Sequence, residues 1–174
     1  MSWIMMDVET DGPAPGLYSM ASFGAVVVRE GLKDTFYSEI LRPLEGAKCI
    51  PEAIAVSNIT PEQMQSGADP AERMPAFIDW LKSVGKGKPM FISDNNGFDW
   101  QFMNWYLWKF TGGNPFGHSS TNLGSLYKGL EKTMFKNFKH LRQTTHTHNP
   151  VDDAVGNAEA LLQMKEAGLQ ISLD

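Results

Sequence analysis

Two carboxylates end an apolar run near the start of this sequence, in the stretch MDVETDG at residues 6–12. Asp7 and Glu9 are two residues apart, so on a strand both side chains would point to one face, about 6–7 Å apart at Cα. Carboxylates side by side at the end of a buried strand repel each other and lose hydration. A divalent cation would offset that cost. The pair therefore predicts either a cation site or a simple acidic turn, and the apolar lead-in favours the cation site.

A second acidic residue follows another apolar run. Asp99 comes soon after the run Pro89–Ser93 and stands in or near the first turn of the next predicted helix. Alone, it would be explained by complementing the helix dipole, a contribution of a few tenths to about 1 kcal/mol. Considered together with Asp7 and Glu9, Asp99 is a candidate cation ligand that lies at the end of a second element.

The third acidic stretch opens the last predicted helix. Asn149 is a natural N-cap and Pro150 a natural first residue, which leaves His148 just outside the helix. Asp152 and Asp153 then fall in the first turn, on opposite flanks of the apolar stripe, and helical geometry does not choose between them. Three element ends thus carry acidic residues, and one also carries a histidine.

Local patterns predict the elements that must position these groups. Apolar runs predict strands at Trp3–Val8, Ala21–Val28, Thr35–Leu41 and Pro89–Ser93, the first three as an antiparallel meander. Capping signals and periodicity predict helices that start near Thr60 and Asp69, that cover Gly97–Phe110 and Asn122–Lys132, and that run on from Pro150. Pro75 predicts a kink or a late start, and Thr111–Thr121 predicts a glycine-rich loop. The order of elements predicts an α/β fold in which a mixed sheet is flanked by helices.

Composition limits the class of protein. The 42% of hydrophobic residues fits an ordinary globular core, and by length residues 1–174 form a single domain. A net charge of −5 is unlike that of a protein that coats long nucleic acid, so a nucleic-acid partner would be held at a short, local site. The single cysteine, Cys49, excludes an internal disulfide and fits a reducing compartment. With neither a signal peptide nor a run of roughly 18 apolar residues for a membrane span, we expect a cytoplasmic protein without a membrane partner.

Together the three stretches resemble the motifs of the DEDDh family of 3′→5′ exonucleases, which includes ribonuclease T and the proofreading subunits of DNA polymerases. The stretch Asp7–Thr10 is similar to the family's Asp-x-Glu-Thr motif, and Asn95–Asp99 is similar to its second motif. A histidine followed five residues later by aspartate is the third motif, which selects Asp153 with His148. The similarity runs from about residue 1 to 162, and the chain also looks like small bacterial or phage exonuclease and exoribonuclease domains.

This resemblance implies a ribonuclease H-like fold, a mixed five-stranded sheet flanked by helices, although only four strands are located above. It also implies hydrolysis of single-stranded RNA or DNA 3′ ends to nucleoside 5′-monophosphates with two divalent cations, Mg²⁺ or Mn²⁺. In the implied roles Asp7 bridges both cations, Glu9 and Asp153 complete the first site, and Asp99 holds the second. His148 is the implied general base, because imidazole readily accepts a proton at neutral pH.

The resemblance further implies that Thr10, Asn95 and Phe98 contact the substrate. Many family members carry an apolar wedge for the terminal base after the first motif, whereas this chain has Pro13-Ala14-Pro15-Gly16. No motif encodes contacts to the 2′-hydroxyl, so the choice between RNA and DNA is open. Dimers are common among relatives, which makes a homodimer a further expectation.

Two sequence features have a structural and a functional interpretation. The segment 128–142 carries five basic residues against one acidic residue, and is either a solvated helix face or a guide for backbone phosphates. These residues are Lys128, Lys132, Lys136, Lys139 and Arg142, with Glu131. The aromatic residues of 100–110 are too dense for one helix face, so most belong to the core and one or two could stack on bases.

Two other functions compete with the exonuclease interpretation. A different metal-dependent phosphohydrolase could use His146, His148 and Asp152, although two nearby histidines are more often just an exposed loop. A non-catalytic nucleic-acid-binding module could share the same fold. The complete set of four carboxylates and a histidine argues against the second alternative, because a degenerate copy would usually lose at least one of them.

Overall fold

The computed structural model describes residues 1–173, and these contain five strands and six α-helices. The strands are β1 (Ser2–Thr10), β2 (Met20–Val27), β3 (Thr35–Tyr37), β4 (Pro89–Ser93) and β5 (Ser120–Asn122). The helices are α1 (Pro51–Ala55), α2 (Pro61–Gln65), α3 (Pro70–Val84), α4 (Asn96–Thr111), α5 (Leu123–Leu130) and α6 (Pro150–Glu166), with a short 3₁₀ helix η1 (Lys139–Leu141). None of these described helices is long and apolar enough to cross a membrane.

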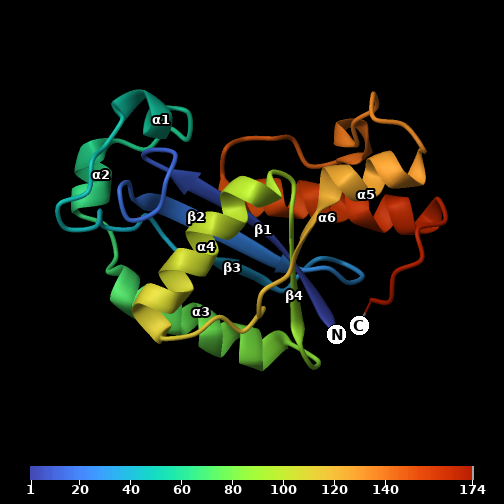
Figure 1. The fold of residues 1–174 in the computed structure, drawn as a ribbon, viewed down its shortest axis with the longest axis horizontal. Coiled ribbons are helices and arrows are strands. Elements are labelled where there is room, and N and C mark those ends of the chain that lie inside the picture. The colour runs from blue at the N-terminus through green and yellow to red at the C-terminus, as the bar shows by residue number, and fades with distance from the viewer. Residues whose placement is uncertain (174) are drawn as a thin grey trace.

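All five strands form one mixed sheet in the order β3-β2-β1-β4-β5. The strands β1, β2 and β3 pair antiparallel, as the short connections predicted, whereas β4 and β5 run parallel to β1. Helices α3 and α4 pack on one face of this sheet, and α5 and α6 pack on the other (Figure 1). The predicted mixed five-stranded sheet flanked by helices is therefore confirmed.

The central strand β1 is covered on both faces, which is why its sequence is a continuous apolar run. Ile4 and Met6 belong to the core under α3 and α4, whereas Met5 belongs to the core under α5 and α6. Because side chains alternate along a strand, Asp7 and Glu9 share the face of Met5 and point to the side of α6. This alternation brings the acidic end of β1 toward the last helix.

The helix starts follow the local signals. The hydroxyl of Thr60 accepts from the backbone N–H of Gln63, and the Gln63 side chain accepts from the backbone N–H of Thr60, which completes the predicted capping box. Asp69 caps α3 and Asn149 caps α6, each followed by proline at the first helical position.

Several predicted boundaries are wrong for identifiable reasons. Strand β3 ends at Tyr37 rather than at Leu41, because Glu39 takes a left-handed backbone with φ of +64° that an extended strand does not allow. Helix α3 does not start late at Pro75. It begins at Pro70 and continues through Pro75, which is exposed.

The missing fifth strand begins within the stretch predicted as a loop up to Thr121 and ends at Asn122, which was predicted to open the next helix. Strand β5 has three residues and is recognised by its parallel pairing with Phe91, Ile92 and Ser93 rather than by any pattern of its own. The following helix α5 ends at Leu130 instead of Lys132, which has a left-handed backbone with φ of +53°. The short helices α1 and η1 were not predicted.

Candidate active site

Three carboxylates meet where β1 ends against the first turn of α6. One side-chain oxygen each of Asp7, Glu9 and Asp153 lies within 4.8 Å of the others. Asp7 and Glu9 come from β1, and the Asp153 side chain, which is fully buried, comes from α6. Residues separated by about 145 positions in the sequence thus form one compact acidic group, which has the size of a cation site.

Gly24 is the residue that lets α6 approach β1 so closely. It lies on β2 directly across from Asp7, and a Cβ added there would be 2.3 Å from the carbonyl carbon of Pro150. No side chain fits at that distance, so only glycine allows the first turn of α6 to rest on the sheet. The backbone of this turn carries Asp153, so the position of Asp153 depends on the absence of a side chain at Gly24.

Asp99 approaches the same end of the sheet from the other side. The register pairs Met5 with Ile92, so the chain leaves the parallel strand β4 level with Asp7 and enters α4, whose first turn contains Asp99. Asp99 is 3% exposed, and its Oδ2 has no hydrogen-bond partner among the described residues. A buried, unpartnered carboxylate oxygen is a group that a cation would satisfy.

We call these four carboxylates the carboxylate cluster, and within it the pKa values of Asp7, Glu9 and Asp99 are raised. Burial is the main cause that raises the pKa of Asp99 to about 7, and the nearby charges of Asp94 and Glu9 contribute to the same rise. Burial also raises the pKa of Asp7 well above its usual value, with additional contributions from Asp99, Glu9 and Asp153. Such shifts arise where carboxylates are buried close to one another, and they are frequent at functional sites.

The loop before α6 wraps around the Asp153 carboxylate. The backbone N–H groups of Thr147 and His148 donate to its two oxygens, each at 3.0 Å, and Nδ1 of His146 lies 2.8 Å from Oδ1. His148 adopts a left-handed backbone with φ of +59°, and its Nδ1 lies 3.9 Å from Oε1 of Glu9. The loop therefore points the His148 ring toward the cluster, and its backbone N–H groups fix the orientation of the carboxylate.

The structure distinguishes Asp152 from Asp153, the two adjacent aspartates between which helical geometry did not choose. Asp153 points into the cluster, whereas Asp152 lies outside it and accepts a hydrogen bond of 3.1 Å from the Thr147 hydroxyl. The alternative set of His146, His148 and Asp152 is not brought together as a metal-binding group. The two histidines are grouped with Asp153 instead.

The predicted substrate-contacting residues lie in two different places. Thr10 and Phe98 line a cavity of about 450 Å³ that adjoins Glu9, whereas Asn95 does not line it. The other lining residues are Val8, Gly12, Pro13, Ile50, Ala53 and Val56. Helix α1 and its flanks, which were not predicted, therefore supply much of an apolar wall beside the cluster.

Two polar residues at the site were missed or placed differently by the sequence analysis. The Ser57 hydroxyl donates to Oε2 of Glu9, and no motif singled it out. Arg142 was grouped with the basic segment, but its side chain is only 9% exposed and its Nη2 lies 3.1 Å from Oδ2 of Asp94. It also donates to Asn157, and its charge lowers the pKa of Asp7 against the larger opposing effect of burial. Arg142 is thus a buried cation behind the cluster and not part of an exposed guide.

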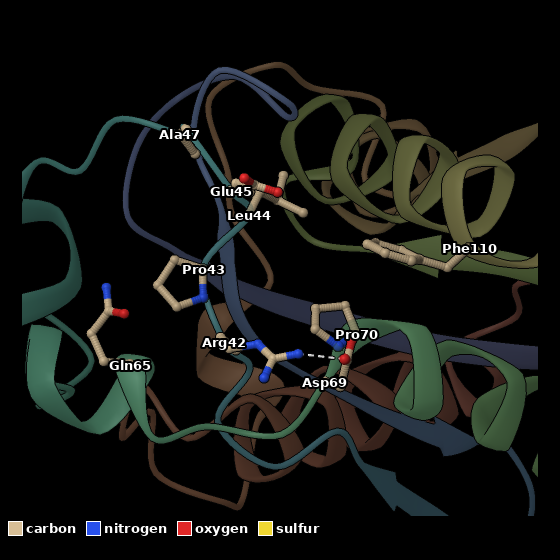
Figure 2. A pocket seen from close by; sticks show the side chains of 10 residues that line it. Arg42, Pro43, Leu44, Glu45, Ala47, Gln65, Asp69, Pro70 and Phe110 are labelled. Atoms are coloured by element: carbon tan, nitrogen blue, oxygen red, sulfur yellow. Dashed lines mark hydrogen bonds and ion pairs between the residues drawn. The ribbon is translucent and has the colours of Figure 1, made fainter.

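Other hollows of the surface do not contain the cluster. A cavity of about 570 Å³ lies between the loop at residues 42–47, α2, and the facing ends of α3 and α4, with Arg42 paired to Asp69 at its edge (Figure 2). A third cavity, of about 590 Å³, lies at the end of α5 and is lined by Lys128, Lys132 and Phe135 among others. The four carboxylates line neither of these two cavities.

Comparisons with known proteins show the family to which the chain belongs. A family model described as an exonuclease, RNase_T, matches residues 4–161. The 3′-5′ DNA exonuclease Cap18 of Escherichia coli is 36% identical over 137 residues, which cover 77% of this chain and 72% of that protein.

Two solved structures share the fold at low sequence identity. Cell-death related nuclease 4 superposes with a TM-score of 0.76 at 16% identity, covering 96% of this chain. This chain spans 64% of that nuclease's length. A 3′-exonuclease that recognises the histone mRNA stem-loop has a TM-score of 0.77 at 18% identity, and covers 99% of this chain and 85% of its own. The family match and the Cap18 similarity place this chain in the RNase_T exonuclease family, as a 3′→5′ exonuclease with a ribonuclease H-like fold.

Proposed function

We propose that this protein removes nucleotides from the 3′ end of single-stranded DNA with the help of two divalent cations, and that residues 1–174 act as one exonuclease domain. The observation that carries the proposal is the convergence of Asp7, Glu9 and Asp153 from β1 and α6 on one point. DNA is favoured over RNA by the similarity to Cap18, whose name gives DNA as its substrate. The expected products are nucleoside 5′-monophosphates.

The carboxylate cluster fits cations that prefer oxygen ligands. All four groups are carboxylates, a donor set that suits Mg²⁺ or Mn²⁺ rather than softer metals. Asp7 is central and would contact both cations, Glu9 and Asp153 would hold one of them, and Asp99 would hold the other. When bound, a pair of cations supplies charge stabilisation to the attacking water and to the departing 3′-oxygen.

His148 is proposed to accept the proton of the attacking water. Its ring faces Glu9, and its backbone N–H holds Asp153, so the ring lies next to the point where the reacting phosphate must be. A general base must come within about 2.6–3.2 Å of the proton's donor. The left-handed turn at His148 lets the ring project from the loop toward that position.

The cavity beside Glu9 is proposed to hold the terminal nucleotide. Its walls combine the apolar side chains of Ile50, Val56 and Phe98 with the backbone around Gly12 and Pro13. An aromatic and aliphatic wall of this kind accepts the face of any base. The base would thus be held by residues of α1 and α4 and their flanks, which would take the place of the apolar wedge that this chain lacks after its first motif.

The single strand behind the terminal nucleotide is proposed to pass along the end of α5. Lys128 and Lys132 line the cavity there together with Phe135, which is 98% exposed. Lys136 of the same segment is paired with Glu131, whereas Lys128 and Lys132 form no ion pair with any described residue, and their charges lie beside the exposed ring. Lysines and an exposed aromatic ring are what a flexible single strand needs for phosphate and base contacts.

An end-labelled substrate assay tests this function. We expect the protein with Mg²⁺ or Mn²⁺ to shorten single-stranded DNA from the 3′ end one nucleotide at a time, and to leave a circular single strand intact. Chelator and Asp7→Asn should each abolish the activity, whereas Asp79→Asn, on the exposed side of α3, should leave it unchanged. Cleavage of the circle would contradict an exonuclease, and faster degradation of RNA than of DNA would contradict the assigned substrate.

A further inference from the structure

His146 lies at the cluster but has no part in the proposed reaction. Its Nδ1 is 2.8 Å from Oδ1 of Asp153, and its side chain is 48% exposed, so it is accessible from solvent. The rings of His146 and His148 are 4.3 Å apart between centroids and are inclined by 68°. Ligand atoms of His146, His148 and Asp153 all lie within 4.8 Å of one another.

These three residues offer a donor set unlike that of the carboxylate cluster. Two imidazole nitrogens and one carboxylate oxygen suit Zn²⁺ and similar transition metals, whereas Mg²⁺ and Mn²⁺ prefer oxygen alone. Zinc commonly takes three such protein ligands at about 2.0–2.2 Å and leaves a fourth position to water. Small ring movements would bring the ligand atoms to that spacing, and both histidines are on an exposed loop.

One ligand of this set is already held in place. The backbone N–H groups of Thr147 and His148 orient the Asp153 carboxylate, so a metal would need to draw in only the two rings. Hydrogen bonds that orient a metal ligand typically raise its metal affinity. The loop is thus arranged as a small chelating unit at the edge of the carboxylate cluster.

We propose that His146, His148 and Asp153 form a binding site for Zn²⁺ that overlaps the catalytic site and switches the exonuclease off. This inference rests on the proposed function, in which Asp153 holds a catalytic cation and His148 accepts a proton. Zinc at the new site takes both groups out of the reaction at once. The two metal sites therefore exclude each other, and zinc inhibits by competing with the catalytic cation for Asp153.

The test compares wild-type protein with His146→Ala and with the control His118→Ala, which removes an exposed histidine elsewhere on the surface. Zinc affinity is measured by calorimetry without substrate, and zinc inhibition is measured on single-stranded DNA in excess Mg²⁺. We expect His146→Ala to keep its Mg²⁺-dependent activity within about threefold, to bind zinc at least ten times more weakly, and to need at least ten times more zinc for half-inhibition. Titration with Mn²⁺ should show no dependence on His146.

Equal zinc affinity in the wild type and His146→Ala would overturn the site. Loss of the Mg²⁺-dependent activity in His146→Ala would also overturn it, because His146 would then belong to the reaction. A wild type that binds zinc through His146 but digests no DNA in Mg²⁺ alone would instead overturn the proposed function, and the inhibitory role with it. The calorimetry without substrate separates these two failures.

Discussion

Replacing Asp99 by asparagine should stabilise the metal-free protein at pH 8 while it abolishes exonuclease activity. Asp99 is 3% exposed, and burial raises its pKa to about 7. At pH 8 the folded protein must therefore carry a buried negative charge close to Glu9 and Asp7. Asparagine has nearly the same shape without the charge, so the substitution removes an electrostatic penalty together with a proposed cation ligand.

The size of the effect follows from the pKa of Asp99. A rise from 3.8 to about 7 corresponds to an upper limit of about 4 kcal/mol, since each pKa unit is about 1.4 kcal/mol. Neighbouring carboxylates share the protons of this site, so we expect a gain of about 2–4 kcal/mol. In a protein of this size that is a rise in Tm of roughly 4–16 °C.

The direction of the pKa shift of Asp99 also predicts how the stability of the fold depends on pH. A raised carboxyl pKa means that the folded state binds the proton more tightly than the unfolded state, so stability is lost as pH rises from about 4 through about 7. The advantage of Asp99→Asn should thus be largest at pH 8, fall to less than half at pH 5, and disappear below pH 4.

Denaturant unfolding in chelator at pH 8 and pH 5 measures these differences, with Asp79→Asn as an exposed control that should change little. Saturating Mn²⁺ should reduce or reverse the stability advantage of Asp99→Asn over the wild type. The wild type gains more stability from binding the ion than Asp99→Asn does. An Asp99→Asn protein that is no more stable than the wild type at pH 8 would refute the view that Asp99 is strained by its charge.

Five other substitutions, two of them as matched comparisons, probe the geometry of the site. Gly24→Ala should lower turnover about 100-fold or more and destabilise the fold by about 1–3 kcal/mol, measured by single-turnover assay and denaturant unfolding, because its Cβ would push the first turn of α6 off the sheet. His148→Ala should lose about 10²–10⁴-fold in single-turnover rate with substrate binding retained, whereas His146→Ala should be mild; the reverse order would withdraw the base assignment. Asp153→Ala should be inactive and should lose its thermal stabilisation by Mn²⁺, whereas Asp152→Ala should keep both, and an inactive Asp152→Ala would show that the wrong aspartate was assigned.

The sequence by itself determined those features whose causes are local. The capping box of Thr60 and Gln63, the proline starts after Asp69 and Asn149, and the apolar run of β1 each act within a few residues, and each appears in the structure as predicted. The sequence also predicted that the ends of three elements carry acidic residues, because the periodicities of strands and helices are regular. These signals were enough to predict a mixed sheet, and the three acidic motifs supported the resemblance to the exonuclease family.

Only the tertiary structure decided how those element ends meet. Strand β5 exists because it pairs with β4, and Arg142 is buried because Asp94 and Asn157 surround its guanidinium; neither fact has a local signal. Residue spacing left Asp152 and Asp153 equivalent as helix positions, and packing separates them. Gly24 admits the backbone of α6, and that approach turns Asp153 toward β1. A contact across more than a hundred residues depends on which surfaces pack together, and the periodicity of a single segment does not encode it.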